Sequence, residues 1–559
     1  MVKGLWSPAS RIARAALVAV AVAGLLSHSV MGWAQEDGAS GRSASFMKHG
    51  TVGSPPGPGD FHRSRRELVL RELPADAVAI VLGSPTRNRS GDVDHPYRQS
   101  SDLLYLTGSS EPGSALVLVP GGVALDGDTV TEVLFLPAPS PHGRIWTGRR
   151  LSPAEAESEL GISRAVEVGR FEEIVAPLLE SHRLVTLPLP RGVDAGSDLS
   201  GQIEILGRVA EFSDATGMEQ RLLSMLLSVD SDADKEAVTE RVAAYAARGW
   251  TAQPGTQQVI DAFLAAPGLS EWRAWKETHY DGRYVDTSTL RQLLDRLRSE
   301  KTEEELELLR RAIDITTSAH REAFRSAEPG MHEFEIEAVI GYVFRREGAT
   351  GPAFPSIVGS GENSLVLHYD ANRRRMQAGD VVVMDIGAEY GGYAADVTRT
   401  IPVSGVFSAE QRAVYEIVLA ASEAAIQASR SGESFWTTNQ VARAVVADGL
   451  VGLGLLADPD QVTRFLPHPV SHYLGLDVHD VGPYGPLQPG NVITVEPGIY
   501  IRPADDIDPK WWNIGVRIED DVLITEGEPV LLSGSAPRTV AAIEKLMRET
   551  GIGNQPVGP

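Results

Sequence analysis

Four acidic residues in the C-terminal half of the sequence lie on apolar segments, where an acid is unusual. Asp385 directly follows the run Val-Val-Val-Met, and Glu496 ends the run Val-Ile-Thr-Val. Asp396 and Glu519 lie within two further hydrophobic segments. A buried carboxylate is costly unless it shares a proton or meets a cation. Taken singly, each residue could be a surface acid, but together they indicate a buried acidic group with a common counter-charge.

Three histidines lie within 12 residues of the same half, at His468, His472 and His479. A single one could be a hydrogen-bonded core residue, but with the four acids they offer an oxygen-rich set of metal ligands. Four carboxylates carry a charge of −4, which two divalent cations would neutralise. Oxygen ligands with one imidazole suit Mn²⁺ or a similar ion better than a thiolate-type zinc site. Two such ions about 3.5–4 Å apart would hold a bridging hydroxide as nucleophile and polarise a carbonyl group.

The spacing of Asp385 and Asp396 predicts that their carboxylates face one another. Tyr390, Gly391 and Gly392 offer a turn between two apolar strands. A two-residue turn centred on Tyr390 and Gly391 would place Asp385 directly opposite Asp396, with Cβ atoms about 5 Å apart. Facing carboxylates repel each other unless they share a proton or bind a cation. The alternative is a turn that carries two exposed acids.

The sequence also excludes several other chemistries. Its 559 residues include no cysteine, which excludes thiolate nucleophiles, cysteine-ligated zinc and disulfide frameworks. The patterns G-x-S-x-G of serine hydrolases and G-x-x-x-x-G-K-S/T of phosphate loops are absent. The net charge of −24 argues against nucleic acid or an anionic membrane as a partner, because a strongly negative surface repels both.

The elements that must hold these residues follow an α/β pattern in the first part of the chain. Residues 64–73 have helical periodicity, and residues 200–300 are mostly helical by period. Short apolar runs typical of buried strands lie at 77–82, 115–119 and 133–136.

The main domain boundary is predicted near residue 299. Thr302 and Glu305 form a helix-capping pair at the start of an amphipathic helix predicted over 301–325. We expect an N-terminal domain over 60–298 with a helical insertion at 200–290, a domain with the acidic residues over 299–548, and a tail over 549–559.

The first 34 residues are typical of a secretory signal peptide. Lys3, Arg11 and Arg14 form a positive start, and an apolar run of 12 residues follows. A membrane-spanning helix needs about 20 apolar residues, so a membrane span is the less favoured alternative. Cleavage is expected before Gln35, and residues 35–59 form a linker rich in Gly, Ser and Pro. We expect an exported protein, periplasmic or secreted, without a stable membrane span.

Motifs in both halves of the chain point to one family. Those of the C-terminal half are NSLVLHY at 363–369, MDIGAEYGGYAADVTRT at 384–400, HPVSHYLGLDVHDVG at 468–482, TVEPGIY at 494–500 and VRIEDD at 516–521. Those of the N-terminal half are PYRQSSDLLYLTG at 96–108 and WTGRRL at 146–151. Together they closely resemble bacterial Xaa-Pro aminopeptidase, also called aminopeptidase P. The resemblance covers about residues 60–190 and 295–548.

This resemblance implies both a fold and a set of metal ligands. The fold would be mixed α/β (α+β), with an N-terminal α/β domain followed by a C-terminal pita-bread catalytic domain, a curved antiparallel sheet covered by helices. Asp385 would bind one metal ion, His472 and Glu496 would bind the other, and Asp396 and Glu519 would bridge the two. Glu496 would also transfer a proton towards the leaving nitrogen, as general base and then acid.

The resemblance further implies which residues meet the substrate. His368 and His479 would hydrogen-bond the substrate and the transition state. His468 and Arg517 would either support the ligands or contact the substrate, and Tyr500 is a further substrate-contacting candidate. Homo-oligomerisation is implied too, with Trp146 near a neighbouring subunit's site.

The sequence departs from the family pattern at two places. Pro469 stands where the family usually has glycine beside an active-site histidine, which would stiffen the loop without removing a ligand. Residues 200–290 form an insertion relative to compact members, and the sequence assigns it no role.

Three functions are compatible with these residues. The first is an aminopeptidase that removes the residue before a penultimate proline, and the second is a prolidase-like enzyme confined to Xaa-Pro dipeptides. The third is a non-catalytic or metal-free peptide-binding relative. Loss of metal ligands would mark the third, and here all five positions are filled.

Overall fold

The computed structural model describes most of the chain between residues 60 and 554. The described residues are 60–139, 141–187, 197–209, 222, 225–226, 229, 231–247, 252, 254–279, 286 and 289–554. The predicted signal peptide, the linker up to residue 59 and the end of the tail, 555–559, lie outside them. No helix among the described residues has the length and apolarity that a membrane crossing requires.

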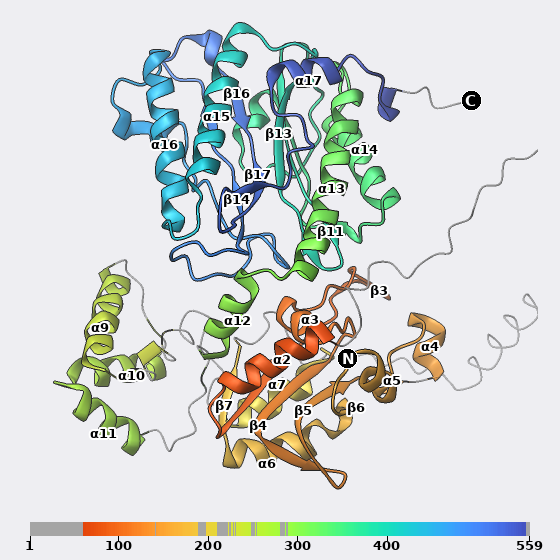
Figure 1. Ribbon diagram of the computed structural model, residues 1–559, viewed down its shortest axis with the longest axis vertical. Coiled ribbons are helices and arrows are strands. Elements are labelled where there is room, and N and C mark those ends of the chain that lie inside the picture. The colour runs from red at the N-terminus through yellow and green to blue at the C-terminus, as the bar shows by residue number, and fades with distance from the viewer. Residues whose placement is uncertain are drawn as a thin grey trace, which may run out of the picture. The chain divides into compact units, whose positions relative to one another are not determined.

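A five-stranded mixed sheet forms the core of the first domain, in the order β6-β5-β4-β1-β7 (Figure 1). Its strands are β1 (Ala77–Leu82), β4 (Ala115–Leu125), β5 (Asp128–Leu136), β6 (Ala165–Glu167) and β7 (Arg183–Thr186). Strand β1 pairs antiparallel with β4 and parallel with β7. The remaining elements are α2 (Asp60–Glu72), β2 (Asn88–Ser90), β3 (Val93–Asp94), α3 (Ser101–Thr107), α4 (Pro141–Thr147), α5 (Pro153–Glu159) and α6 (Phe171–Ser181).

The sequence located the strands of this sheet better than it located their ends. The strand predicted at 77–82 is confirmed as β1, but the strand predicted at 115–119 continues through Pro120, Gly121 and Gly122 to Leu125. The pairing of β4 with β5 shifts register between Leu118 and Val123. Proline and glycines inside a strand are tolerated at such an irregularity, although in the sequence they resemble a strand end.

Helices follow the sheet, as the sequence predicted for residues 200–300. They are α7 (Ser200–Val209), α9 (Asp232–Ala247), α10 (Pro254–Ala265), α11 (Leu269–His279) and α12 (Thr289–Ser299). Phe263 and Trp272 pack edge to face with ring centroids 5.0 Å apart in a small apolar cluster of their own. Helices α9, α10 and α11 therefore share a local core of their own.

The second domain begins with a long helix at the predicted position. Helix α13 (Glu303–Ser326) follows Thr302, whose backbone N–H donates to Glu305 Oε2 at 2.9 Å, as the capping pair predicted. Helices α14 (Glu333–Arg346), α15 (Ala409–Ala428) and α16 (Phe435–Gly452) complete the long helices of this domain, and α17 (Val540–Leu546) is shorter. In the view of Figure 1, α15 and α16 lie to the left and α13 and α14 to the right, and all four helices contribute to one buried apolar cluster with the strands of this domain.

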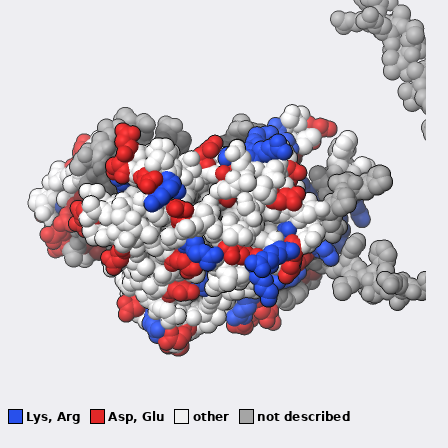
Figure 2. Space-filling model, turned by 90° about the horizontal axis from the view of Figure 1, so that it is seen from above, with Lys and Arg blue, Asp and Glu red and all other residues white. Residues whose placement is uncertain are grey.

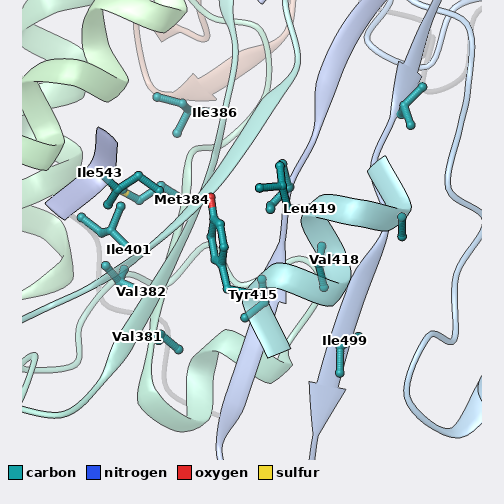
Figure 3. Packing of buried hydrophobic residues seen from close by; sticks show 14 of the residues in the cluster. Val381, Val382, Met384, Ile386, Ile401, Tyr415, Val418, Leu419, Ile499 and Ile543 are labelled. Atoms are coloured by element: carbon teal, nitrogen blue, oxygen red, sulfur yellow. The ribbon is translucent and has the colours of Figure 1, made fainter. Parts of the chain in front are cut away.

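Short antiparallel strands lie between these helices and carry the acidic residues. The first group comprises β8 (Gly351–Pro352), β9 (Ile357–Ser360), β10 (Val381–Ile386), β11 (Ala388–Tyr390), β12 (Tyr393–Ala394) and β13 (Val397–Pro402). The second comprises β14 (Val492–Val495), β15 (Gly498–Ile501), β16 (Ile514–Arg517), β17 (Asp520–Leu523) and β18 (Val530–Leu531). One face of these strands packs on the helices. Figure 3 shows Tyr415, Val418 and Leu419 of α15 near Met384 of β10 and Ile499 of β15, and all five residues belong to one buried apolar cluster.

The predicted register of the Asp385–Asp396 hairpin was wrong by two residues. Tyr390 pairs with Tyr393, and Asp385 pairs with Thr398 instead of Asp396. Gly391 and Gly392 both have positive φ, 58° and 86°, so the two-residue turn is centred on this glycine pair, which alone satisfies its backbone without strain. Because side chains alternate with a period of two, the shift leaves Asp385 and Asp396 on the same face as diagonal neighbours.

Candidate metal centre

Five side chains assigned to metal binding from the sequence come from separate segments of the second domain. Asp385 lies in β10, and Asp396 lies between β12 and β13. Glu496 follows β14 directly, and Glu519 lies between β16 and β17. His472 lies beside β14, because its carbonyl accepts the N–H of Thr494 at 2.9 Å. Strand pairing thus gathers residues that are more than 100 positions apart.

Asp396, His472 and Glu519 form the centre of this group. One possible ligand atom from each lies within 4.8 Å of the others. His472 Nε2 is 3.4 Å from Asp396 Oδ2 and 4.0 Å from Glu519 Oε1. The same nitrogen is 3.8 Å from Glu496 Oε1, which brings a fourth predicted ligand to the cluster. Asp385 lies close enough to Asp396 to raise its pKa.

Burial and mutual repulsion both oppose ionisation of these acids. Burial raises the pKa of Asp396 and of Glu519 well above the ordinary range, and the other carboxylates of the group raise both further. Burial also raises the pKa of Glu496 to about 7. Asp385 Oδ1 and Asp396 Oδ1 are buried and have no hydrogen-bond partner among the described residues. Oxygen atoms in this state fit hard divalent cations, which would replace the missing partners and hold the acids ionised.

Arg517 supplies one positive charge beneath the four carboxylates. Its side chain is 4 % exposed, and its guanidinium donates to Asp385 Oδ2 at 2.7 Å and to the Tyr500 hydroxyl at 3.0 Å. The hydroxyl of Thr398 receives a third contact at 3.2 Å. One guanidinium cannot balance four carboxylates. The sequence left two roles open for Arg517, to support the ligands or to contact the substrate. Its hydrogen bond to Asp385 fits the first role.

His472 is prepared to use Nε2 as a ligand. Its Nδ1 is 3.0 Å from the carbonyl of Tyr473, which can only accept a hydrogen bond, so Nε2 is the ring nitrogen that faces the acids. The backbone N–H of His472 donates to the hydroxyl of Thr494 at 3.2 Å, which fixes the ring's attachment to β14.

The other predicted histidines surround this cluster. The ring of His479 lies 4.1 Å from that of His472, and burial lowers the pKa of His479 to about 4, with His472 and His368 contributing. His368 is exposed and lies near enough to His479 to affect its pKa. These positions leave two imidazoles at the open side of the acidic group.

His468 and Tyr500 form a hydrogen-bonded pair at another side. His468 Nε2 is 2.9 Å from the Tyr500 hydroxyl, and Nδ1 is 2.7 Å from the carbonyl of Pro469 and 3.7 Å from Glu496 Oε2. Tyr500 is only 1 % exposed, so its hydroxyl faces Arg517 and His468 and not the solvent. Burial lowers the pKa of His468 to about 4, with Arg517 contributing.

Residues that the sequence did not single out support the ligands from behind. The hydroxyl of Thr398 donates to Glu519 Oε2 at 2.6 Å, and Asp521 Oδ2 accepts the backbone N–H of Asp396 at 3.3 Å. Arg399 pairs with Asp520 at 2.6 Å, with both side chains fully buried. The run Glu519, Asp520, Asp521 resembles a solvated acidic stretch in the sequence, and only its flanking apolar residues signal burial.

Comparison with known proteins places this site in a family. The family model "Metallopeptidase family M24" matches residues 307–526, and "Aminopeptidase P, N-terminal domain" matches residues 62–186. Xaa-Pro aminopeptidase of Escherichia coli strain K12 is 36% identical over 502 residues, which cover 87% of this chain and 97% of the relative. Human Xaa-Pro dipeptidase is 35% identical over 543 residues, which cover 87% and 93%.

Solved structures agree with the sequence relatives. Aminopeptidase PepP of Pseudomonas aeruginosa superposes with a TM-score of 0.68 at 31% identity, covering 87% of this chain and 97% of that one. The fold and the clustered ligands thus define a metallopeptidase of the M24 type. Within it, the chain belongs to the Xaa-Pro aminopeptidase (aminopeptidase P) family, and its second domain has the predicted pita-bread fold.

Proposed function

We propose that this protein is a dinuclear metallo-exopeptidase that releases the N-terminal residue from peptides with proline at the second position. One observation carries the proposal: two buried carboxylates, two partly buried ones and His472 converge on a site that holds one guanidinium. Such a group has no stable ionised form without added cations. Relatives named Xaa-Pro aminopeptidase, together with aminopeptidase structures, supply the reaction class.

We assign two divalent cations, with Mn²⁺ as the preferred ion, to the five ligands. Asp385 would hold one ion, His472 and Glu496 would hold the other, and Asp396 and Glu519 would lie between them. A ligand set of four carboxylates and one imidazole, without sulfur, supports a hard or borderline ion, and the charge of the acids matches two of them. When bound, the ions would supply a hydroxide nucleophile at neutral pH and neutralise charge that develops on the carbonyl oxygen.

The chain's own residues would orient the peptide and move a proton. Glu496, which would also be a metal ligand, is assigned to accept a proton and to return it to the leaving nitrogen. His368 and His479 lie on the open side of the acids, where hydrogen-bond donors can hold the substrate and stabilise the transition state. Arg517 and Tyr500 would hold Asp385 and His468 in place from below.

The proposed preference for proline at the second position rests on the chemistry of the peptide bond to proline. A peptide bond to proline nitrogen has no N–H and a ring-fixed φ, so peptidases that read this N–H handle it poorly. The proposed site would surround the reacting carbonyl with carboxylates and imidazoles and would require no such donor. Proton delivery from Glu496 to the tertiary nitrogen would complete the cleavage.

An Xaa-Pro dipeptidase is the second candidate, favoured by the 35% identity to the human enzyme of that name. It would share the fold and the metals and differ in the length of peptide it accepts. A non-catalytic peptide-binding relative is not favoured, because all five ligand positions are filled and carboxylates of Asp396, Glu496 and Glu519 lie within 4.0 Å of His472 Nε2.

Further proposals concern the protein's surroundings. We propose export, with the mature chain starting near Gln35, on the basis of the positive start and the apolar run. An intact Met1 on native protein would contradict this proposal.

We also propose a homo-oligomer, because Ile145 and Trp146 of α4 are 82% and 72% exposed. Acidic and basic side chains are interspersed on the face shown in Figure 2, which offers no basic stripe for nucleic acid.

A peptide panel with metal analysis tests the proposed function. An Arg-Pro-Pro-type tripeptide should lose its first residue, while the matched peptide with alanine second should be cut far more slowly. Equal rates on both peptides would contradict the proline specificity. A dipeptide such as Ala-Pro, cut faster than the tripeptide, would favour the dipeptidase instead. Metal analysis of the active protein should give two ions per chain.

A further inference from the structure

The carboxylate of Glu333 is buried far from solvent and lies outside the metal centre. Glu333 is the first residue of α14, and it is 0% exposed. Its side chain makes no ion pair with a lysine, arginine or histidine among the described contacts, yet five donors surround it. A buried carboxylate with this many directed hydrogen bonds fixes the groups that donate to it.

All five donors come from one segment, residues 360–374. Glu333 Oε1 accepts the N–H of Ser360 at 2.8 Å, the hydroxyl of Ser360 at 2.7 Å and the amide of Asn363 at 3.2 Å. Oε2 accepts the hydroxyl of Tyr369 at 2.8 Å and the N–H of Arg374 at 2.8 Å. The backbone N–H of Glu333 also donates to the carbonyl of Arg374 at 3.0 Å. One side chain therefore joins the start, the middle and the end of the segment.

This segment carries His368 and is attached to the metal centre at its start. Ser360 ends β9 and pairs with Val382 of β10, the strand that carries Asp385. Tyr369 directly follows His368, so the Glu333–Tyr369 hydrogen bond holds the residue next to the imidazole. His368 itself is exposed, so its position depends on the segment that carries it and not on burial of its own ring.

We infer that Glu333 is a positioning residue that holds His368 towards the substrate. The inference rests on the proposed function, because it uses the role assigned to His368. Among the described residues, the hydrogen bonds of the Glu333 carboxylate all go to the 360–374 segment and none goes to a metal ligand, so Glu333 would act through this segment. Its carboxylate fixes both ends of this segment to helix α14, and with them the stretch that carries His368.

Glu333→Gln is the principal variant, because it keeps the size of the side chain and replaces one acceptor oxygen by an amide donor. At least two of the five donors then lose their acceptor, and the segment loosens. We expect kcat to fall about tenfold to 100-fold. This fall is no larger than the roughly 10²–10³-fold that a positioned donor such as His368 contributes as a whole. KM should change less than threefold, and the metal content should be that of the wild type.

A double-mutant cycle separates positioning from general damage. If Glu333 acts through His368, adding Glu333→Gln to His368→Ala should lower kcat by less than about threefold beyond His368→Ala alone. A further loss of tenfold or more would overturn the inference, and so would an unchanged kcat in the single variant Glu333→Gln. Wild-type activity in His368→Ala would instead contradict the proposed role of His368.

Two more variants keep the test decisive if Glu333→Gln folds poorly. Tyr369→Phe removes a single donor next to His368; we expect kcat to fall about threefold, with no further fall in the His368→Ala background. Glu335→Gln is the matched control on the same helix, because Glu335 is exposed and glutamine can also cap His332. It should keep kcat within twofold, and a Tyr369→Phe enzyme equal to this control would contradict the inference.

Discussion

Two buried clusters of charge in this protein differ in where their positive charge comes from. The balanced cluster joins Asp102 and Asp480 to Arg298 and Lys301. The acid-rich cluster consists of Asp385, Asp396, Glu496 and Glu519 with Arg517. In the first, the chain supplies a cation for each acid; in the second, it supplies one for four.

The balanced cluster connects the two domains around the predicted boundary. Arg298 is 2% exposed and donates to Asp102 Oδ1 at 2.7 Å and to Asp480. Lys301 Nζ donates to Asp480 Oδ2 at 2.9 Å. Burial alone would raise the pKa of Asp480, but the charges of Lys301 and Arg298 outweigh it and lower the pKa below its usual value. Burial would also raise the pKa of Asp102, but the charges of Arg298 and Arg291 outweigh it and lower the pKa.

In the acid-rich cluster the pKa values shift in the opposite direction. Burial raises the pKa of Asp396, Glu496 and Glu519, and their neighbours raise the pKa of Asp396 and Glu519 further. The degree of burial is similar in the two clusters, so the difference lies in the counter-charge. Buried acids that the chain balances are structural, whereas buried acids that it leaves unbalanced mark a site for an external cation.

Among the changes that test this comparison, removal of metal should have the largest effect, on both activity and stability. Exhaustive chelation and dialysis should lower activity at least about 10³-fold, because several kcal/mol of charge stabilisation would be lost. The melting temperature should fall as well, since the ions bind the folded state only. Mn²⁺ should restore both. Full activity in protein shown to be metal-free would contradict the proposed mechanism.

Loss of a cation from the balanced cluster should destabilise the fold whether or not metal is present. Arg298→Met removes the partner that Asp102 and Asp480 share and leaves each acid with one remaining cation, Arg291 and Lys301 respectively, which should cost about 1–3 kcal/mol of the free energy of unfolding. Denaturant unfolding measures this loss. Arg464→Met, which breaks the exposed pair with Asp506, is the matched control and should change stability little. Equal losses of stability in both variants would mean that burial of the Arg298 ion pairs does not determine how much they stabilise the fold.

The smallest expected effect is a gain of stability, and it depends on pH. In metal-free protein the folded-state pKa of Glu519 is above its unfolded value, so its ionisation opposes folding at high pH and ceases to do so as pH falls. Glu519→Gln removes this cost. Metal-free Glu519→Gln should therefore be more stable than metal-free wild type at pH 8.

This gain should shrink as pH falls towards the ordinary range of a glutamate. With Mn²⁺ present the order should reverse, because the variant has lost a ligand. Thermal unfolding at pH 8 and pH 5.5, with and without Mn²⁺, measures all four conditions. A metal-free variant less stable than metal-free wild type at pH 8 would show that ionisation of Glu519 does not oppose folding.

The sequence by itself determined the features that depend on neighbouring residues. Apolar runs predicted β1 and β10, and the pair Thr302 and Glu305 predicted the start of α13. Acids within such runs indicated the cluster, because a charge on a buried strand is costly unless a partner or a cation meets it. The motifs around these residues then indicated the family. Each of these inferences needs only local periodicity, composition or spacing.

Only the tertiary structure decided the contacts between distant segments. The hairpin register depended on which two residues of Tyr390, Gly391 and Gly392 adopt positive φ, and the sequence offered more than one choice. The five donors to Glu333 and the partners of Arg298 could not be predicted, because Arg298 lies 196 residues from Asp102 and 182 from Asp480. The sequence pattern indicates neither that such a residue is buried nor which residue it contacts, because both depend on how strands and helices pack. Packing sums many weak contacts over the whole fold, and no local segment of the sequence contains that sum.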